Sequence, residues 1–179
     1  MTSRIRVLLA AFATLALSPG GFVSAESAGA WVLPRDSGLL RPPAVHPVNA
    51  QVDYGEGGAQ YGADRGGRMH EGQDVFAPAG TPLLAVRDGL VLETGNDGGR
   101  GNYLAIWSPE ARETYVYLHL LEEPSVKSGQ RVRAGDRVGR LGCTGSCFGD
   151  HLHFEVRRGR SLEGPPSDPR ALLQRLPRA

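Results

Sequence analysis

The sequence predicts an all-β protein built mainly from antiparallel strands, with one short helix near the C-terminus. Glycine (25 of 179 residues) and proline (13) are both frequent, and turns rich in these residues separate short apolar runs. No long segment shows the apolar period of an amphipathic helix. The length suits a single domain with a substantial core.

The first 25 residues read as an export signal. Residues 1–6 are short and basic, residues 7–17 are apolar, and a small-x-small pattern ends at Ala25. The apolar run falls short of the ~20 residues of a membrane span, so we expect no stable membrane insertion after cleavage. The alternative is an uncleaved N-terminal anchor. The prediction is a signal peptide over 1–25 and a mature protein that is secreted or otherwise extracytoplasmic, in the cell wall or periplasm.

Three further regions are expected after the signal. Residues 26–50 contain four prolines and no sustained period, which predicts an extended N-terminal arm. Residues 51–160 form the predicted domain, which opens with a glycine-rich loop over 54–72. Residues 161–179 form a C-terminal tail. A possible helix there has Ser167 or Asp168 as N-cap and a proline in its first turn.

Strand signals are dense within the domain. Apolar or alternating segments bounded by turn residues occur at 81–95, 101–108, 113–123, 128–142 and 151–159. Residues 96–100 read as the tip of a hairpin. In the third segment, strict alternation would place Tyr115, Tyr117 and His119 on one face.

The last of these segments contains two histidines one residue apart. In an extended strand His151 and His153 point the same way, while Leu152, Phe154 and Val156 share the opposite face. One face therefore suits a core. The paired imidazoles on the other face indicate either a metal site or an acid–base site.

A second group of polar residues sharpens this choice. His70 and Asp74 stand four apart around a glycine and could turn toward one point, with His153 as a third ligand. Two imidazoles and a carboxylate are the ligand set of a catalytic zinc site with one open position. His119 and His151 would then remain unligated nearby, as groups that move protons or stabilise developing charge.

Each of these residues also has a purely structural interpretation. A single histidine on a strand is commonly a hydrogen-bonded packing residue, and Asp74 could stabilise a turn. His46, between a valine and a proline, is interpreted as structural. The conjunction of "HxxxD", "YLHL" and "HLH" in one small domain favours a shared site over independent coincidence.

The two cysteines, Cys143 and Cys147, lie in "GCTGSCFGD" just before this strand. In an exported protein a small disulfide loop is the favoured interpretation. The alternative is metal binding, but two thiols make only half of a structural zinc site.

Together, the quoted segments from residue 65 to 158 resemble the lysostaphin/LytM-type zinc metallopeptidases, the M23 family. They include "GRMHEGQDVFAPAGTP", "TYVYLHL" and "GDHLHFEV". The resemblance implies a mostly antiparallel sheet that forms a narrow groove, with one zinc ion per chain at its floor. It also implies cleavage of peptide bonds in the stem or cross-bridge peptides of bacterial peptidoglycan.

Carried over by position, the resemblance gives each polar residue a role. His70, Asp74 and His153 would bind zinc, His151 would be the general base, and His119 would stabilise the transition state. No cell-wall-targeting module or long coiled coil is recognisable beside the domain.

Three functions follow from these observations. The first is an exported zinc endopeptidase that acts on peptidoglycan peptides. The second is a non-catalytic, wall-binding regulator of other wall hydrolases, against which the intact His119 and His151 argue. The third is a phosphocarrier domain, which the export signal and Asp74 disfavour. The near-zero net charge gives no reason to expect nucleic acid as a partner, and we expect a monomer.

Overall fold

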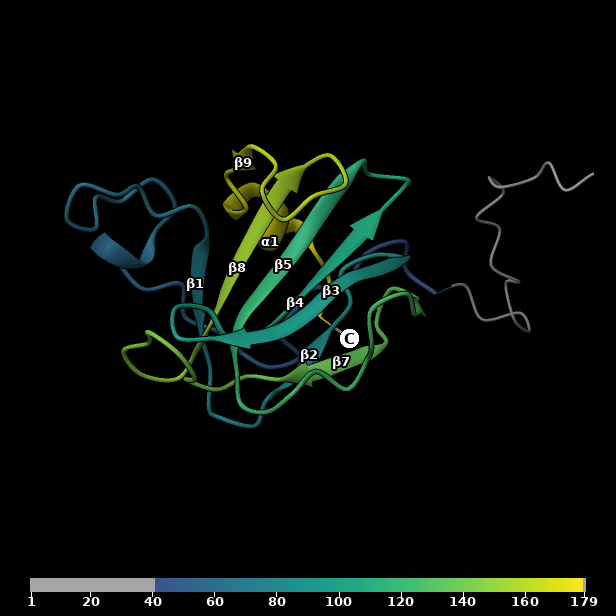
Figure 1. Ribbon diagram of the computed structural model, residues 1–179, viewed down its shortest axis with the longest axis horizontal. Helices are drawn as coiled ribbons and strands as arrows, with labels where there is room; N and C mark the ends of the chain where they lie inside the picture. The colour runs from purple at the N-terminus through teal and green to yellow at the C-terminus, as the bar shows by residue number, and fades with distance from the viewer. Residues whose placement is uncertain (1–40, 179) are drawn as a thin grey trace, which may run out of the picture. The chain divides into compact units, whose positions relative to one another are not determined.

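The computed structural model describes residues 41–178, and its main feature is an antiparallel seven-stranded sheet (Figure 1). The strands lie side by side in the order β1-β8-β5-β4-β3-β6, with β9 also paired to β8. The predicted all-β class is therefore confirmed. The expected signal peptide and most of the expected arm lie outside the described residues.

The described elements have the following bounds. The large sheet contains β1 (Gln73–Phe76), β3 (Gly89–Asp97), β4 (Gly101–Ser108), β5 (Glu113–Leu120), β6 (Arg131–Val132), β8 (His151–Arg158) and β9 (Pro166–Ser167). A second sheet pairs β2 (Pro82–Leu84) with β7 (Arg137–Arg140). The short helices are the 3-10 turn η1 (Gly57–Ala59) and α1 (Arg170–Arg175).

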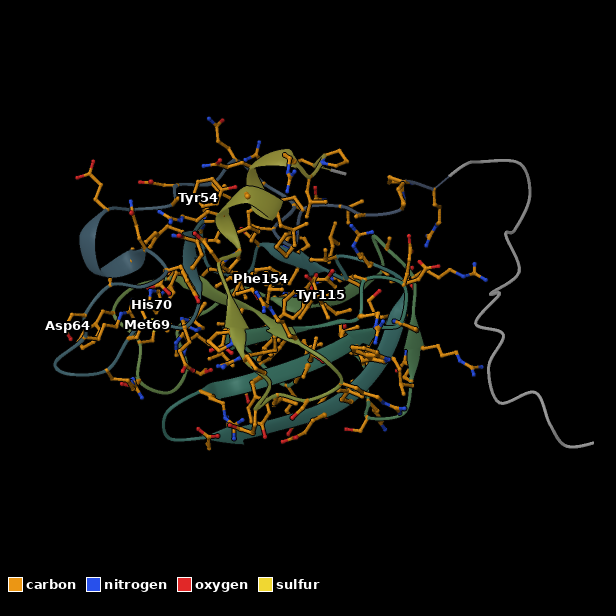
Figure 2. The ribbon with its side chains drawn as sticks, turned by 90° about the horizontal axis from the view of Figure 1, so that it is seen from above. Tyr54, Asp64, Met69, His70, Tyr115 and Phe154 are labelled. Atoms are coloured by element: carbon orange, nitrogen blue, oxygen red, sulfur yellow. A yellow bond between two sulfur atoms is a disulfide. The ribbon has the colours of Figure 1, made fainter. Side chains whose placement is uncertain are left out.

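The main core lies on one face of the large sheet. Leu152, Phe154 and Val156 all point into it, which confirms the predicted alternation of β8. Tyr115 stacks on Phe154 with ring centroids 6.1 Å apart, and both rings lie in the interior in Figure 2. Burial of such aromatic rings contributes a large share of the hydrophobic stabilisation.

A buried tyrosine joins the large sheet to the small one. The hydroxyl of Tyr117 donates a hydrogen bond to the carbonyl of Leu84 (3.0 Å) and accepts one from the amide of Val86 (3.1 Å). Both bonds satisfy polar groups that would otherwise be costly to bury. This contact fixes β5, which leads to His119, against the segment that follows β2.

The described part of the N-terminal segment packs onto the fold. The amide of Val45 donates to the carbonyl of Val86 (3.0 Å), and Val48 pairs with Leu83 of β2. At the other end of the chain, α1 buries Leu173. Its N-cap is Pro169, and the Asp168 carboxylate accepts the Arg170 amide at 2.9 Å, so the helix begins slightly later than predicted. Among the described residues, no helix is long and apolar enough to span a membrane.

Candidate metal centre

The pairing of β1 with β8 brings three of the predicted site residues together: Asp74, His151 and His153. β1 runs antiparallel to β8, so that Asp74 lies directly opposite His153 and Phe76 opposite His151. Directly opposed residues project their side chains to the same face of a sheet. His70 arrives from the loop that precedes β1, at one end of the sheet (Figure 2).

The glycine between His70 and Asp74 is required by close packing. A Cβ atom on Gly72 would lie 2.6 Å from Nε2 of His153 and 2.7 Å from the carbonyl oxygen of Phe154. A side chain at this position would therefore push β8 away. His70 and Asp74 can both approach His153 because the residue midway between them, Gly72, has no side chain.

Three side-chain atoms of this group form a nearly equilateral triangle. Nε2 of His70 lies 2.9 Å from Nδ1 of His153, and Oδ1 of Asp74 lies 3.1 Å and 3.0 Å from these two nitrogens. Two ligands of a tetrahedral zinc ion, with bonds of about 2.0–2.1 Å, stand about 3.3 Å apart. The triangle is close to that size, and its donors suit zinc, so the residues present fit the metal.

The remaining nitrogen of each imidazole in the triangle is held by a fixed acceptor. Nδ1 of His70 lies 2.8 Å from the carbonyl of Gln60, and Nε2 of His153 lies 2.9 Å from Oε1 of Glu155. Such contacts fix the tautomer and ring orientation of metal-binding histidines. Each ring is therefore left with one lone pair directed at the other two members of the triangle.

Glu155 is itself held in place by a chain of charges. Its Oε2 accepts a hydrogen bond from Nε of Arg157 (2.7 Å), and Nη2 of Arg157 also bonds Glu71 (2.7 Å). Sequence reasoning missed both β8 residues. The signal was present, because Glu155 and Arg157 continue the alternation that places His151 and His153 on one face.

Asp74 is the anionic member of the triangle. Burial raises the pKa of its carboxyl, but the contacts with His153 and His70 lower it more, so the pKa lies well below its usual range. The guanidinium of Arg65 pairs with Oδ2 of Asp74 and also bonds the carbonyl of Gly58 (2.7 Å). Arg65 is a second contact that the sequence did not reveal.

Two more predicted histidines stand beside the triangle. Nδ1 of His119 lies 2.8 Å from the carbonyl of Thr144, and Nδ1 of His151 lies 2.8 Å from the carbonyl of Gly149. Their ring centroids are 5.0 Å apart, and Nε2 of His151 lies 3.6 Å from Oδ1 of Asp74. All five predicted residues are thus brought together.

His119 is neutral at neutral pH. Burial, together with the neighbouring His151 and His153, lowers its pKa to about 4, despite raising contributions from the Thr144 carbonyl and Asp74. With Nδ1–H donating to Thr144, the nitrogen that remains free to accept a proton is Nε2.

The structure corrects the predicted face of His119. Tyr115 and Tyr117 point into the core, whereas His119 lines the opposite face together with Leu118. The pairing of β4 with β5 shifts register here, because Asn102 pairs with Leu120 but Leu104 pairs with Tyr117. This β-bulge puts His119 at φ 64° and turns its side chain out of strict alternation.

These residues lie in a groove of about 950 Å³, here called the histidine groove. Its floor is the face of the large sheet opposite the main core. Its rims carry two exposed apolar side chains, Met69 on the loop before β1 and Phe148 on the loop before β8. The predicted narrow groove is therefore present, and no residue from 41–50 is among those that line it.

Comparison with known proteins agrees with this geometry. The family model described as Peptidase family M23 matches residues 68–169, a span that contains all five residues. The peptidoglycan DD-endopeptidases ShyA and ShyC of Vibrio cholerae serotype O1 are 44% and 37% identical to this chain. The matches cover 72% and 68% of this chain and 26% and 24% of those proteins. The chain thus spans about a quarter of the length of these relatives.

A solved structure gives the same result for the fold. The catalytic domain of lysostaphin from Staphylococcus simulans superimposes with a TM-score of 0.59 at 32% identity, covering 70% of this chain and 93% of that domain. The family model matches more than half of the chain. The chain therefore belongs to peptidase family M23.

Proposed function

We propose that this protein is an exported, zinc-dependent endopeptidase that hydrolyses peptide bonds in the stem or cross-bridge peptides of bacterial peptidoglycan. One observation carries the proposal. Three potential metal-ligand atoms, from His70, Asp74 and His153, converge on one point in the histidine groove. Two further imidazoles face the same space with a free nitrogen each. The names of the V. cholerae relatives support the choice of peptidoglycan as substrate.

The metal would be held by His70, Asp74 and His153. Bound zinc would supply Lewis acidity, which polarises a carbonyl and lowers the pKa of a bound water. The depressed pKa of Asp74 keeps an anionic donor available across the neutral range.

His151 is the proposed general base. Its Nδ1 lies against the Gly149 carbonyl, so Nε2, 3.6 Å from Asp74, is the atom that accepts the proton of the attacking water. The same nitrogen then passes the proton to the amine nitrogen as the C–N bond breaks. His119 lies beside His151, and we assign it the stabilisation of the transition state, in which its free Nε2 accepts a hydrogen bond from the attacking water.

Export is supported by the signal-like N-terminal sequence and by a disulfide inside the domain. Cys143 and Cys147 form a disulfide, as predicted. Disulfides persist mainly in oxidising compartments outside the cytoplasm.

The test is hydrolysis of purified peptidoglycan by zinc-loaded protein, with and without a chelator. Mass spectrometry should show new amino termini in the stem or cross-bridge peptides, and the chelator should abolish them. The matched control is His151→Ala, which keeps the proposed ligands. Absence of chelator-sensitive release from every wall type tried would overturn the proposal and favour the non-catalytic, wall-binding alternative.

A further inference from the structure

We infer that the disulfide-bonded loop Cys143–Gly149 is a positioning element that orients both unligated imidazoles of the histidine groove. This inference rests on the proposed function, in which those imidazoles handle protons and charge. His119 and His151 come from different strands, yet both Nδ1 atoms contact carbonyls of this one loop, Thr144 and Gly149, at 2.8 Å each.

The first half of the loop is docked onto neighbouring strands. The hydroxyl of Thr144 donates to the carbonyl of Leu120 (2.7 Å) and accepts the amide of Asn102 (2.9 Å). The amide of Ser146 donates to the carbonyl of Gly99 (3.0 Å). A Cβ atom on Gly145 would lie 2.2 Å from the backbone nitrogen of Gly101, so these two backbone segments are in close contact. The carbonyl that holds His119 is therefore fixed by several contacts.

The second half of the loop has far fewer restraints. Phe148 is 93% exposed, and Gly149 has φ 88°. Within residues 41–178, the amides of Phe148, Gly149 and Asp150 donate no backbone hydrogen bond. The disulfide packs against this half of the loop, since Sγ of Cys147 lies 3.0 Å from the Gly149 carbonyl oxygen and 3.7 Å from Nδ1 of His151.

The proposed metal ligands do not depend on this loop. Asp74 and His153 are fixed by the pairing of β1 with β8, and His70 is held by the Gln60 carbonyl. Opening the disulfide should therefore leave metal binding intact while releasing the Gly149 carbonyl. His151 would then also populate the tautomer with hydrogen on Nε2, which cannot accept a proton from water at that atom.

The principal test is the double variant Cys143→Ser/Cys147→Ser, loaded with zinc. We expect zinc affinity within about threefold of wild type, with kcat for peptidoglycan fragments reduced by about 10- to 100-fold and KM changed much less, because small misplacements of a reacting group cost on that order. Asp150→Ser is the matched control. Asp150 is exposed and directly follows the loop, and its substitution should leave both kinetic constants unchanged.

Two further measurements separate positioning from general destabilisation. In the background of His151→Ala, opening the disulfide should cost much less than in wild type, because effects that act through one residue are not additive. Treating folded wild-type protein with a phosphine reductant should reproduce the double variant. There the disulfide takes up two electrons and two protons, and the phosphine is oxidised with oxygen from water. The double variant itself should not respond.

A spectroscopic measurement distinguishes failure of this inference from failure of the proposed function. Imidazole ¹⁵N NMR of the zinc-loaded protein should show His119 and His151 with hydrogen on Nδ1, and the double variant should lose that preference at His151. This measurement reports the effect of the loop on the two imidazoles even if no wall substrate is cleaved. An unchanged kcat and unchanged tautomer in the double variant, or loss of zinc binding in parallel with kcat, would overturn the inference.

Discussion

His46 and the imidazoles of the histidine groove are all buried but differ in how their nitrogens are used. His46 is 1% exposed and His70 is 2% exposed. The amide of Val48 donates to Nδ1 of His46 (3.1 Å), and its Nε2 lies 3.1 Å from the hydroxyl of Tyr54. Both nitrogens of His46 are thus satisfied locally, which agrees with its structural interpretation.

In the groove, the nitrogens of each histidine are divided between two tasks. One nitrogen contacts a carbonyl or a carboxylate, and the other faces the space shared with Asp74. The difference teaches that burial does not identify a functional histidine. What identifies it is a ring held by one nitrogen while the other is left for a ligand or a proton.

The largest expected effect comes from removing an atom of the triangle. Asp74→Ala should reduce hydrolysis by more than the roughly 10²–10⁴-fold that a single acid–base group contributes, because zinc loses its anionic ligand. The rate of peptide release at equal protein and zinc concentrations measures this. Activity of Asp74→Ala near that of wild type would show that the triangle is structural, like the surroundings of His46.

The next largest effect is expected at the unligated imidazoles, whose removal should lower activity without loss of zinc. His151→Ala should lower kcat by about 10²–10⁴-fold, since it removes the proposed base, while one zinc ion per chain remains bound. His119→Ala should also retain zinc. Kinetic analysis together with metal analysis of the same samples tests this, and loss of zinc from either variant would contradict the division of roles.

A smaller effect is expected at Glu155, which contacts the proposed ligand His153 but is not itself a proposed ligand. Glu155→Ala should weaken zinc binding by about 10- to 100-fold, because Nε2 of His153 loses the carboxylate that orients the ring. Glu155→Gln keeps an acceptor oxygen and should recover part of the affinity. Competition with a chromophoric chelator measures both variants, and equal affinities for wild type and Glu155→Ala would remove Glu155 from the site.

The smallest effect on activity is expected at His46. His46→Leu should leave hydrolysis unchanged but lower the free energy of unfolding by about 1–3 kcal/mol at pH 7, because the Val48 amide loses its acceptor. Denaturant unfolding measures this difference. An accompanying loss of activity would break the comparison between the two regions.

The stability difference at His46 should also depend on pH. Burial lowers the pKa of His46, so the folded state binds its proton less readily than the unfolded state. Its contribution is present above about pH 6.5 and is lost as the pH falls toward the folded pKa. The gap between wild type and His46→Leu should therefore narrow in acid.

Periodicity in the sequence predicted the parts of the site that depend on side-chain type. The alternation of β8 placed His151 and His153 on one face and Leu152, Phe154 and Val156 in the core, as observed. It failed at His119, because a bulge depends on the register between β4 and β5 and strict alternation assumes that register to be regular.

Other parts of the site had no readable signal. The carbonyls of Gln60, Thr144 and Gly149 orient three histidines, but every residue has a carbonyl, so the sequence does not distinguish these. The pairing of Arg65 with Asp74 likewise depends on how the loop before β1 folds. Backbone contacts and loop paths are long-range outcomes that one sequence does not specify by residue type.

The most direct test of the proposed division between metal ligands and unligated imidazoles is zinc titration under identical conditions. It compares wild type with His70→Ala, Asp74→Ala, His153→Ala, His119→Ala and His151→Ala. We expect one high-affinity zinc ion per chain in wild type. This binding should be retained in the His119 and His151 variants and lost or severely weakened in the other three. Binding that survives loss of Asp74 or His153, or that requires His119, would contradict this division.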